Sequence, residues 1–396
     1  MYRENNYYRL KLAYQSRLKS SQAKKPQRTP KHQQVLETRP STQKSEVSLS
    51  ALNKYHFNFI HPVGKGGFGR VWKVELKRTK EQFAMKEMQK LRILSKRSIH
   101  SVMNERKLLS FLKHPFLVNM HYAFQDRENL YLVMDLLSGG DLRYHLGKAK
   151  RFTESQTQFF VACIVQGLEY IHLNAVIHRD IKPENLVIDS EGYIKITDFG
   201  VARQWTPENA KDTSGTPGYM APEVMCRQNH GIAVDYFALG VIAYECMLGR
   251  RPYIGRNRKE IRDAILSKQV QVRLEEVPEG WSMEAVDFIN SLIQRKVSRR
   301  LGTPTEVKNH PWLRNFNWEK LSSRTLESPY IPPLTDNFDS RVNSEWNDEL
   351  DPNLLHSSVQ GLFAGYYYDT RSNFSSLQDT QKNPVFSRRV SYAKYK

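Results

Sequence analysis

The most informative motif of this chain is His178-Arg179-Asp180-Ile181-Lys182-Pro183-Glu184-Asn185, with Asp198-Phe199-Gly200 beginning 13 residues after Asn185. We expect a hairpin turn at residues 189–192, which brings Asp180, Asn185 and Asp198 together at one site. Asp198 and Asn185 offer the hard oxygen ligands that Mg²⁺ binds together with phosphate oxygens. Asp180 can accept a hydroxyl proton and orient it for in-line attack, while Lys182 can neutralise charge on a transferred phosphoryl group.

A glycine-rich stretch lies upstream, Gly64-Lys65-Gly66-Gly67-Phe68-Gly69-Arg70-Val71. Glycine lets the backbone approach phosphate oxygens without a Cβ clash and presents N–H groups to them. A dinucleotide-binding turn shares this spacing, but there a helix opens at the glycines. Here residues 70–76 continue as an alternating strand, so we predict a hairpin lid over phosphates. A glycine turn without a ligand is the alternative for this motif taken alone.

Lys86 follows one hairpin later, in the short predicted strand Phe83-Ala84-Met85-Lys86. A lone lysine on a strand usually faces solvent, but this one resembles the lysine that pairs with α- and β-phosphates. Such a lysine needs a carboxylate to hold it, and Glu105 in a helical segment is the candidate. A glutamate on a helix is otherwise ordinary, so the pairing depends on the other motifs, which end with Ala221-Pro222-Glu223.

The pattern along the chain predicts an α+β fold with two lobes, because strands precede helices. Strand-like runs occur at residues 57–63, 70–76, 83–87, 117–125 and 130–137, with one helical pattern at 96–113. Helical patterns then follow at residues 152–173, 234–248, 259–266 and 284–293. The apolar run 236–248 is too short to span a bilayer and predicts a buried helix.

Together these motifs resemble the signature set of eukaryotic protein kinases. The resemblance covers about residues 55–313, with a further match in the tail to about residue 369. It implies a small β-rich lobe and a larger helical lobe, ATP and Mg²⁺ as cofactors, and transfer of the γ-phosphoryl group to Ser or Thr hydroxyls of proteins in signalling. It divides the chain into a basic arm at 1–54, a catalytic domain at 55–313 and a tail at 314–396.

The resemblance also assigns the site residue by residue. Asp180 and Lys182 would be catalytic, and Asn185 and Asp198 would bind the metal. The nucleotide would be bound by Val63, Gly64, Gly66, Gly67, Phe68, Gly69, Val71, Ala84, Lys86, Glu105, Met134, Asp135, Leu137, Asp141 and Val187. The stacked hydrophobic spine would consist of Leu109, Met120, His178 and Phe199. Asp235 would anchor the catalytic loop, which contains His178 and Asp180, and Glu223 would pair with Arg300.

Further stretches point to the serine/threonine type and the AGC group. Lys182 after Asp180 and Gly215-Thr216-Pro217 are typical of serine/threonine kinases, and residues 114–118, 300–302 and 307–313 are similar to the AGC group. Residues 329–332 and 337–339 resemble its active-site tether, and 363–368 its hydrophobic motif, which docks onto the small lobe. An aromatic patch on a flexible tail is the alternative for 363–368. Residues 135–146 and 249–253 look closest to the YANK branch.

Two positions depart from the AGC pattern. Asp212 stands three residues before Gly215, where the activating phosphothreonine usually lies, and Tyr367 stands at the Ser/Thr position of the hydrophobic motif. Arg179 and Arg203 would form the phosphate pocket, in which Asp212 offers a single carboxylate. We therefore predict that activity does not strictly require activation-loop phosphorylation.

Other features of the loop leave alternatives open. Thr213 and Ser214 are alternative phosphosites next to Asp212. Ser101, one turn before Glu105, is not basic, which weakens any cross-link from this helix to the activation loop.

Acidic residues predict the substrate. Asp141, Glu184 and Glu245 match positions that receive arginine in basophilic AGC kinases, so we expect Arg at about −3 and −2 from the target hydroxyl. The chain carries such a sequence at Arg388-Arg389-Val390-Ser391, which makes Ser391 a candidate autophosphorylation site.

The amino-acid composition excludes several other classes of protein. The chain has 396 residues with a net charge of +19, and its 39% hydrophobic content excludes wholesale disorder. Three separated cysteines exclude a disulfide scaffold and favour a reducing compartment, cytoplasmic or nuclear. We expect no signal peptide and no transmembrane segment. Residues 1–50 carry 11 Lys or Arg against 3 Glu, and are either a solvated tail or a docking segment for an anionic surface.

Two rival functions are weighed against an active kinase. A kinase-fold scaffold without catalysis usually lacks the lysine, the catalytic aspartate or the metal ligands, all of which are present here as Lys86, Asp180, Asn185 and Asp198. Nucleic-acid binding has only the net charge in its favour and no recognition motif. We expect protein substrates, no specific nucleic acid and a monomer.

Overall fold

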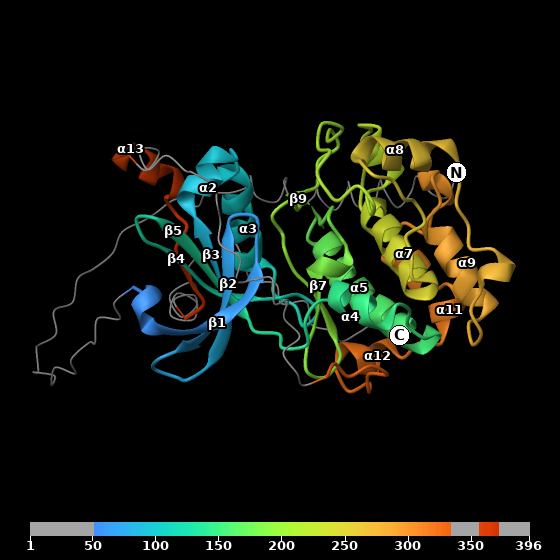
Figure 1. The fold of residues 1–396 in the computed structure, drawn as a ribbon, viewed down its shortest axis with the longest axis horizontal. Coiled ribbons are helices and arrows are strands. Elements are labelled where there is room, and N and C mark those ends of the chain that lie inside the picture. The colour runs from blue at the N-terminus through green and yellow to red at the C-terminus, as the bar shows by residue number, and fades with distance from the viewer. Residues whose placement is uncertain (1–50, 334–355, 372–396) are drawn as a thin grey trace, which may run out of the picture. The chain divides into compact units, whose positions relative to one another are not determined.

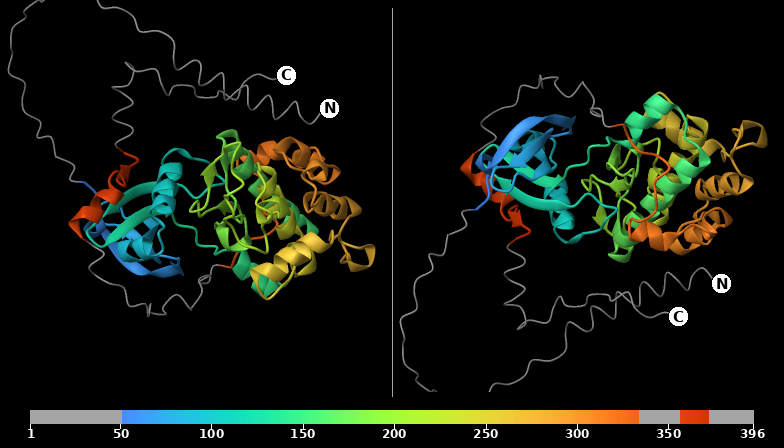
Figure 2. Two further views of the ribbon diagram at one scale, coloured as in Figure 1. Left: turned by 90° about the horizontal axis from the view of Figure 1, so that it is seen from above. Right: turned by 90° about the horizontal axis from the view of Figure 1, so that it is seen from below.

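The computed structural model describes residues 51–333 and 356–371 (Figure 1). Residues 1–50 of the predicted arm (1–54), Asn337-Phe338-Asp339 and Ser391 lie outside the described residues, so the structure does not address what was predicted for them. The described chain folds into a β-rich small lobe and a helical large lobe, which Figure 2 shows from two further sides. The α+β, two-lobed prediction is confirmed.

The small lobe is built on an antiparallel sheet with the strand order β1-β2-β3-β5-β4-β10. The strands are β1 (Phe57–Lys65), β2 (Gly69–Leu76), β3 (Gln82–Gln89), β4 (Met120–Gln125), β5 (Asn129–Asp135) and β10 (Tyr368–Asp369). The sixth strand, β10, comes from the tail and pairs with β4. The other five match the predicted strands to within two residues at each end, except that β4 starts three residues late because Leu117 instead bridges to Ile196 of the large lobe.

Two helices follow β3, where the sequence predicted one. They are α2 (Lys90–Ser95) and α3 (Ile99–Phe111). A short 3-10 helix, η1 (Lys54–His56), lies earlier in the chain, directly before β1. The prediction of one helical pattern over 96–113 is wrong at its start. Arg97 has a φ of 51°, in the left-handed region through which an α-helix does not continue. This break separates α2 from α3, the helix that carries Glu105.

The large lobe is mainly helical. Its helices are α4 (Leu142–Ala149), α5 (Glu154–Leu173), α6 (Pro222–Met225), α7 (Ala233–Leu248), α8 (Arg258–Ser267), α9 (Met283–Leu292), α10 (Pro304–Lys308), α11 (Pro311–Arg314) and α12 (Trp318–Ser322). Shorter elements are β6 (Val176–Ile177), η2 (Pro183–Asn185), β7 (Leu186–Ile188), β8 (Ile194–Ile196), β9 (Arg203–Gln204), η3 (Leu274–Glu276) and η4 (Val297–Arg299). The tail adds α13 (Ser357–Gln360) and η7 (Gly361–Phe363).

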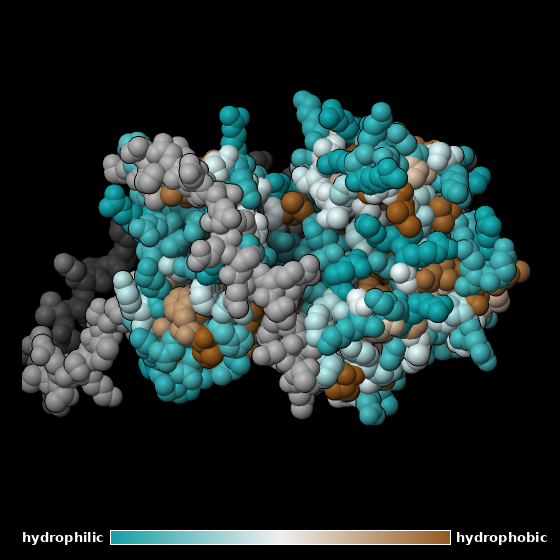
Figure 3. All heavy atoms as spheres, in the orientation of Figure 1, coloured by the Kyte–Doolittle hydropathy of each residue, from teal (hydrophilic) through white to brown (hydrophobic). Residues whose placement is uncertain are grey.

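Helix α7 is the centre of the large lobe. All of residues 234–247 are buried, as expected for a mostly apolar helix, and they include the charged Asp235 and Glu245. Gly249, in the left-handed conformation with a φ of 70°, ends the helix. Within the described part of the chain, no helix has the length and apolarity that crossing a membrane requires. The described surface facing the viewer in Figure 3 is mostly hydrophilic, with scattered apolar residues.

Candidate functional site

A cleft of about 1050 Å³ collects most of the predicted site residues. The glycine loop, β3, α3, the linker after β5, η2 and the residues around Asp198 supply its wall. Of the predicted nucleotide residues, only Gly69 is absent from the wall. A Cβ on Gly69 would lie 1.9 Å from the carbonyl oxygen of Glu87, so this glycine serves the close approach of β2 to β3.

Lys86 reaches the cleft because of strand alternation. Phe83 and Met85 of β3 face a small apolar cluster, so Ala84 and Lys86 face the opposite side. The Lys86 Nζ lies 2.9 Å from Oε1 and 3.2 Å from Oε2 of the buried Glu105. Burial opposes the ammonium charge, but Glu105 and Asp198 outweigh it and raise the pKa of Lys86 above its usual value. The cleft therefore contains a fixed cation.

The two predicted metal ligands lie in the same wall. Asn185 ends η2, and its amide nitrogen donates to the carbonyl oxygen of Asp180 at 2.9 Å. Asp198 has a φ of 61°, and its Oδ1 accepts the N–H of Gly200 at 3.2 Å. Burial opposes ionisation, yet the charge of Lys86 helps to keep the pKa of Asp198 below its usual value. An ionised carboxylate and an amide oxygen are donors that fit Mg²⁺.

Phosphate oxygens would complete such a metal site. Among residues 51–333 and 356–371, no group of three or more His, Cys, Asp or Glu side chains could hold a metal. Mg²⁺ is commonly held by one or two protein ligands plus substrate phosphates. The donor set therefore fits a metal that arrives with a nucleotide.

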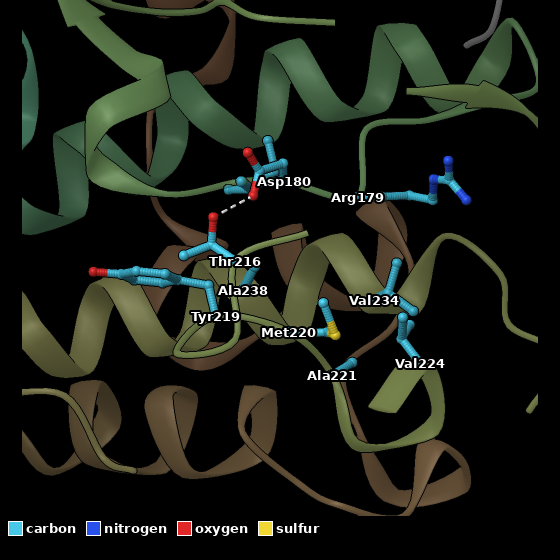
Figure 4. Close-up of a pocket in the computed structure, with 10 residues that line it drawn as sticks. Arg179, Asp180, Thr216, Tyr219, Met220, Ala221, Val224, Val234 and Ala238 are labelled. Atoms are coloured by element: carbon cyan, nitrogen blue, oxygen red, sulfur yellow. Dashed lines mark hydrogen bonds between the residues drawn. The ribbon is translucent and has the colours of Figure 1, made fainter. Parts of the chain in front are cut away.

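Asp180 lies beside the cleft, next to a hydroxyl group of the same chain. Thr216 Oγ1 donates to Asp180 Oδ1 at 2.7 Å (Figure 4) and accepts from Lys182 Nζ at 2.9 Å. Lys182 Nζ also lies 2.8 Å from Asp180 Oδ2. The carboxylate and the ammonium thus hold one hydroxyl between them. Sequence reasoning quoted Thr216 but missed this position.

A buried aspartate holds the catalytic loop from below. Asp235 of α7 accepts the backbone N–H groups of His178 at 3.0 Å and Arg179 at 2.8 Å, and pairs with His172 at 2.8 Å. The His178 ring packs edge-on against Phe199, with centroids 5.1 Å apart. The four residues predicted to form the spine are all buried: Leu109, Met120, His178 and Phe199. Asp235 therefore takes the anchoring position expected of it.

Two further predicted contacts concern the activation segment. The buried Arg300 pairs with Glu223 at 2.6 and 2.9 Å, as expected. Asp212 Oδ2 lies 3.1 Å from Arg179 Nη1, so a carboxylate meets one of the two arginines of the predicted phosphate pocket. No bond from the second arginine, Arg203, to Asp212 is found.

Instead, Arg203 connects the segment to α3. Its Nη2 lies 3.5 Å from Ser101 Oγ, and Asn104 Nδ2 donates to the carbonyl oxygen of Ala202 at 2.9 Å. The expectation that a serine at position 101 weakens the cross-link is therefore incomplete. Asn104, which the sequence did not single out, supplies the shorter bond.

The tail docks onto the small lobe, as predicted, rather than forming a free aromatic patch. Phe363 and Tyr366 are fully buried, and Lys90 Nζ lies 5.1 Å from the Phe363 ring. Arg106, next to Glu105, donates from Nε to the carbonyl oxygen of Tyr366 at 3.0 Å and also bonds that of Tyr367. The tail thus meets α3 within one residue of the Lys86–Glu105 ion pair.

The earlier part of the tail packs against the large lobe. Tyr330 lies 2.6 Å from His145 Nδ1 through its hydroxyl oxygen, and its ring packs edge-on against Phe152 and Phe160. This places residues 329–332 beside α4 and α5, at the large-lobe end of the linker.

The three acidic positions predicted to receive arginine are not equally available. Asp141 caps α4, accepting the N–H of Tyr144 at 2.8 Å. Glu184 and Glu245 are both paired with Arg143 of the same chain. The sequence offered no signal for this pairing, because Arg143 and Glu245 are 102 residues apart.

The two lobes and this constellation define a phosphotransferase of the protein-kinase class. The model of the protein kinase domain matches residues 57–313. Protein kinase 2 of Dictyostelium discoideum is 38% identical over 316 residues, covering 78% of this chain and 65% of its own length. The serine/threonine-protein kinase Sgk1 of Gallus gallus is 34% identical over 363 residues, covering 88% and 81%.

A third relative, a RAC family serine/threonine-protein kinase homolog of Dictyostelium discoideum, is 36% identical over 327 residues, covering 80% of this chain and 72% of its own length. The chain belongs to the protein kinase family, as an AGC-type serine/threonine kinase. The YANK branch stays a prediction.

Proposed function

We propose that this protein transfers the γ-phosphoryl group of MgATP to Ser or Thr hydroxyls of protein substrates. The observation that carries the proposal is the hydroxyl of Thr216, held 2.7 Å from Asp180 and 2.9 Å from Lys182 at the edge of the nucleotide cleft. A substrate hydroxyl in this place would meet a carboxylate that takes its proton and an ammonium that offsets negative charge.

Other side chains of the cleft would bind the phosphates and the metal ion. Lys86, held by Glu105, would pair with the α- and β-phosphates, and the glycine loop would cover them with backbone N–H groups. Asn185 and Asp198 would hold Mg²⁺, which neutralises phosphate charge when bound. Asp235 keeps the backbone of the catalytic loop in place, so that Asp180 needs little rearrangement.

The scaffold alternative has no observation in its favour. A scaffold needs neither the paired Lys86 nor an ionised Asp198, yet both are in place. We further propose that the protein itself is located in the cytoplasm or the nucleus, which its three free cysteines support.

The decisive experiment compares phosphate incorporation into Ser and Thr peptides by the wild type and by Asp180→Asn. We expect the variant to lose about 10²- to 10⁴-fold in kcat, the range of general acid–base contributions. Asp263→Asn, at an exposed carboxylate on α8, is the matched control and should keep wild-type activity. Equal activity of Asp180→Asn and wild type would overturn the proposal, as would activity that survives removal of Mg²⁺ with a chelator.

A further inference from the structure

An arginine of the chain itself occupies the acidic site beside the catalytic loop. This residue is Arg143, the second residue of α4. Its Nε lies 3.0 Å from Glu184 Oε1, and its Nη1 lies 2.8 Å from Glu245 Oε1. Its Nη2 lies 3.2 Å from Glu245 Oε2 and also bonds the hydroxyl of Tyr219. This is bidentate arginine–carboxylate pairing extended to a second carboxylate.

The site lies at the rim where a substrate chain must pass. Glu184 belongs to the wall of the nucleotide cleft together with Lys182 and Asn185. Tyr219 lines the same small cavity as Asp180 and Thr216 (Figure 4). The side chains of Glu184 and Arg143 are 44% and 34% exposed, so solvent and a substrate can reach them.

Glu245 has little capacity left for a second arginine. Its side chain is 9% exposed, its Oε1 accepts from Arg143, and its Oε2 accepts from Tyr219 Oη at 2.6 Å as well as from Arg143. Burial opposes the charge of Arg143, but the hydrogen bonds of Glu245 and nearby negative charges raise the pKa of the guanidinium further, so it stays charged. A substrate arginine would have to displace Arg143, leaving a charge without its partners.

Asp141 remains as a separate acidic group. It is two residues before Arg143, its Oδ1 caps α4, and it forms no ion pair within the described residues. Burial and the nearby charge of Glu184 raise the pKa of Asp141, against the opposing effect of the backbone N–H groups that bond its carboxylate. One acidic position therefore stays open while the other two are engaged.

We propose that Arg143 determines substrate specificity by standing in for a substrate arginine. This deepens the proposed function and rests on it: of the two upstream positions expected to select arginine, the one that would use Glu245 is closed, and the one facing Asp141 is open. The wild type then selects arginine at one upstream position, and removal of Arg143 opens a second.

A positional-scanning peptide library, varied from −5 to −1 before a fixed Ser, tests this directly. We expect wild type to select Arg at one position, and Arg143→Ala to gain a second position with at least about tenfold preference for Arg over Gln, typical of charge-assisted hydrogen bonds. The double variant R143A/E245Q should lose that gain. Arg262→Ala removes an exposed arginine on α8 and is the matched control, with a wild-type profile.

Arg143→Gln provides a second variant in case the alanine variant fails to fold, and it should show the same gain. Two selected positions in wild type, or unchanged profiles in both Arg143 variants, would overturn the proposal and show that Arg143 is only a structural ion pair.

A peptide-binding measurement distinguishes failure of this inference from failure of the proposed kinase activity. Fluorescence anisotropy with Arg and Gln peptides, on Asp180→Asn with and without Arg143→Ala, reports arginine recognition without turnover. If no peptide is phosphorylated, the proposed function fails. A gain in Arg-peptide affinity on removal of Arg143 would still support the inference, and no gain would refute it.

Discussion

Replacing Phe363 with alanine is predicted to release the docked tail segment 356–371 from the small lobe. The ring is fully buried, its short helix η7 lies beside α3, and Lys90 Nζ of α2 is 5.1 Å from the ring centroid. Removing a buried phenylalanine ring costs about 3–5 kcal/mol when the site cannot collapse. At about 1.4 kcal/mol per factor of ten, amide exchange in β10 should accelerate by about 10²- to 10⁴-fold, unless the segment is already held less tightly than that.

Release of the tail should also lower catalysis. Arg106 would lose its bonds to the carbonyl oxygens of Tyr366 and Tyr367, one residue from Glu105. The Lys86–Glu105 pair depends on the position of α3, so we expect a several-fold fall in kcat/KM for ATP and faster exchange along α3. Hydrogen exchange followed by mass spectrometry, together with initial rates, measures both effects.

The control lies one residue away. Leu362 is 49% exposed on the same segment, so Leu362→Ala should leave the exchange of β10 nearly unchanged. The reasoning is refuted if Phe363→Ala behaves like Leu362→Ala. It is also refuted if exchange in α5 and α7 rises as much as in β10, because that would be global unfolding rather than release of the tail.

Two further predictions concern the activation segment and acid stability. Phosphatase-treated wild type should keep activity, whereas Asp212→Ala should lose about 1.4- to fivefold in kcat, because the ion pair between the half-exposed Asp212 and the buried Arg179 contributes about 0.2–1 kcal/mol. An inactive dephosphorylated sample or a fully active variant would contradict this. Burial and the charge of Lys308 lower the pKa of His114 to about 4 from 6.5. The folded state therefore takes up this proton at a lower pH than the unfolded state does. Stability should therefore fall as pH drops from 6.5 to 4, by at most about 3 kcal/mol from this group, and His114→Gln should show a shallower fall in denaturant titrations.

Contiguous motifs made much of the site predictable. Asp180, Lys182 and Asn185 lie within six residues of one loop, so their proximity follows from chain connectivity alone. The alternation of β3 likewise set the face of Lys86, because successive side chains of a strand point to opposite sides. The break between α2 and α3 was not predictable from the hydrophobic pattern, since the left-handed Arg97 has no marker in it.

The family, the two lobes and the catalytic groups could therefore be predicted from the amino-acid sequence, because the catalytic groups lie close together along the chain. The contacts between distant segments became visible only in the folded chain: Arg143 bonds Glu245 across 102 residues, and Arg106 bonds Tyr366 across 260. Such pairs form only once helices and lobes have packed, because geometry rather than order along the chain then selects the partner that lies within bonding distance.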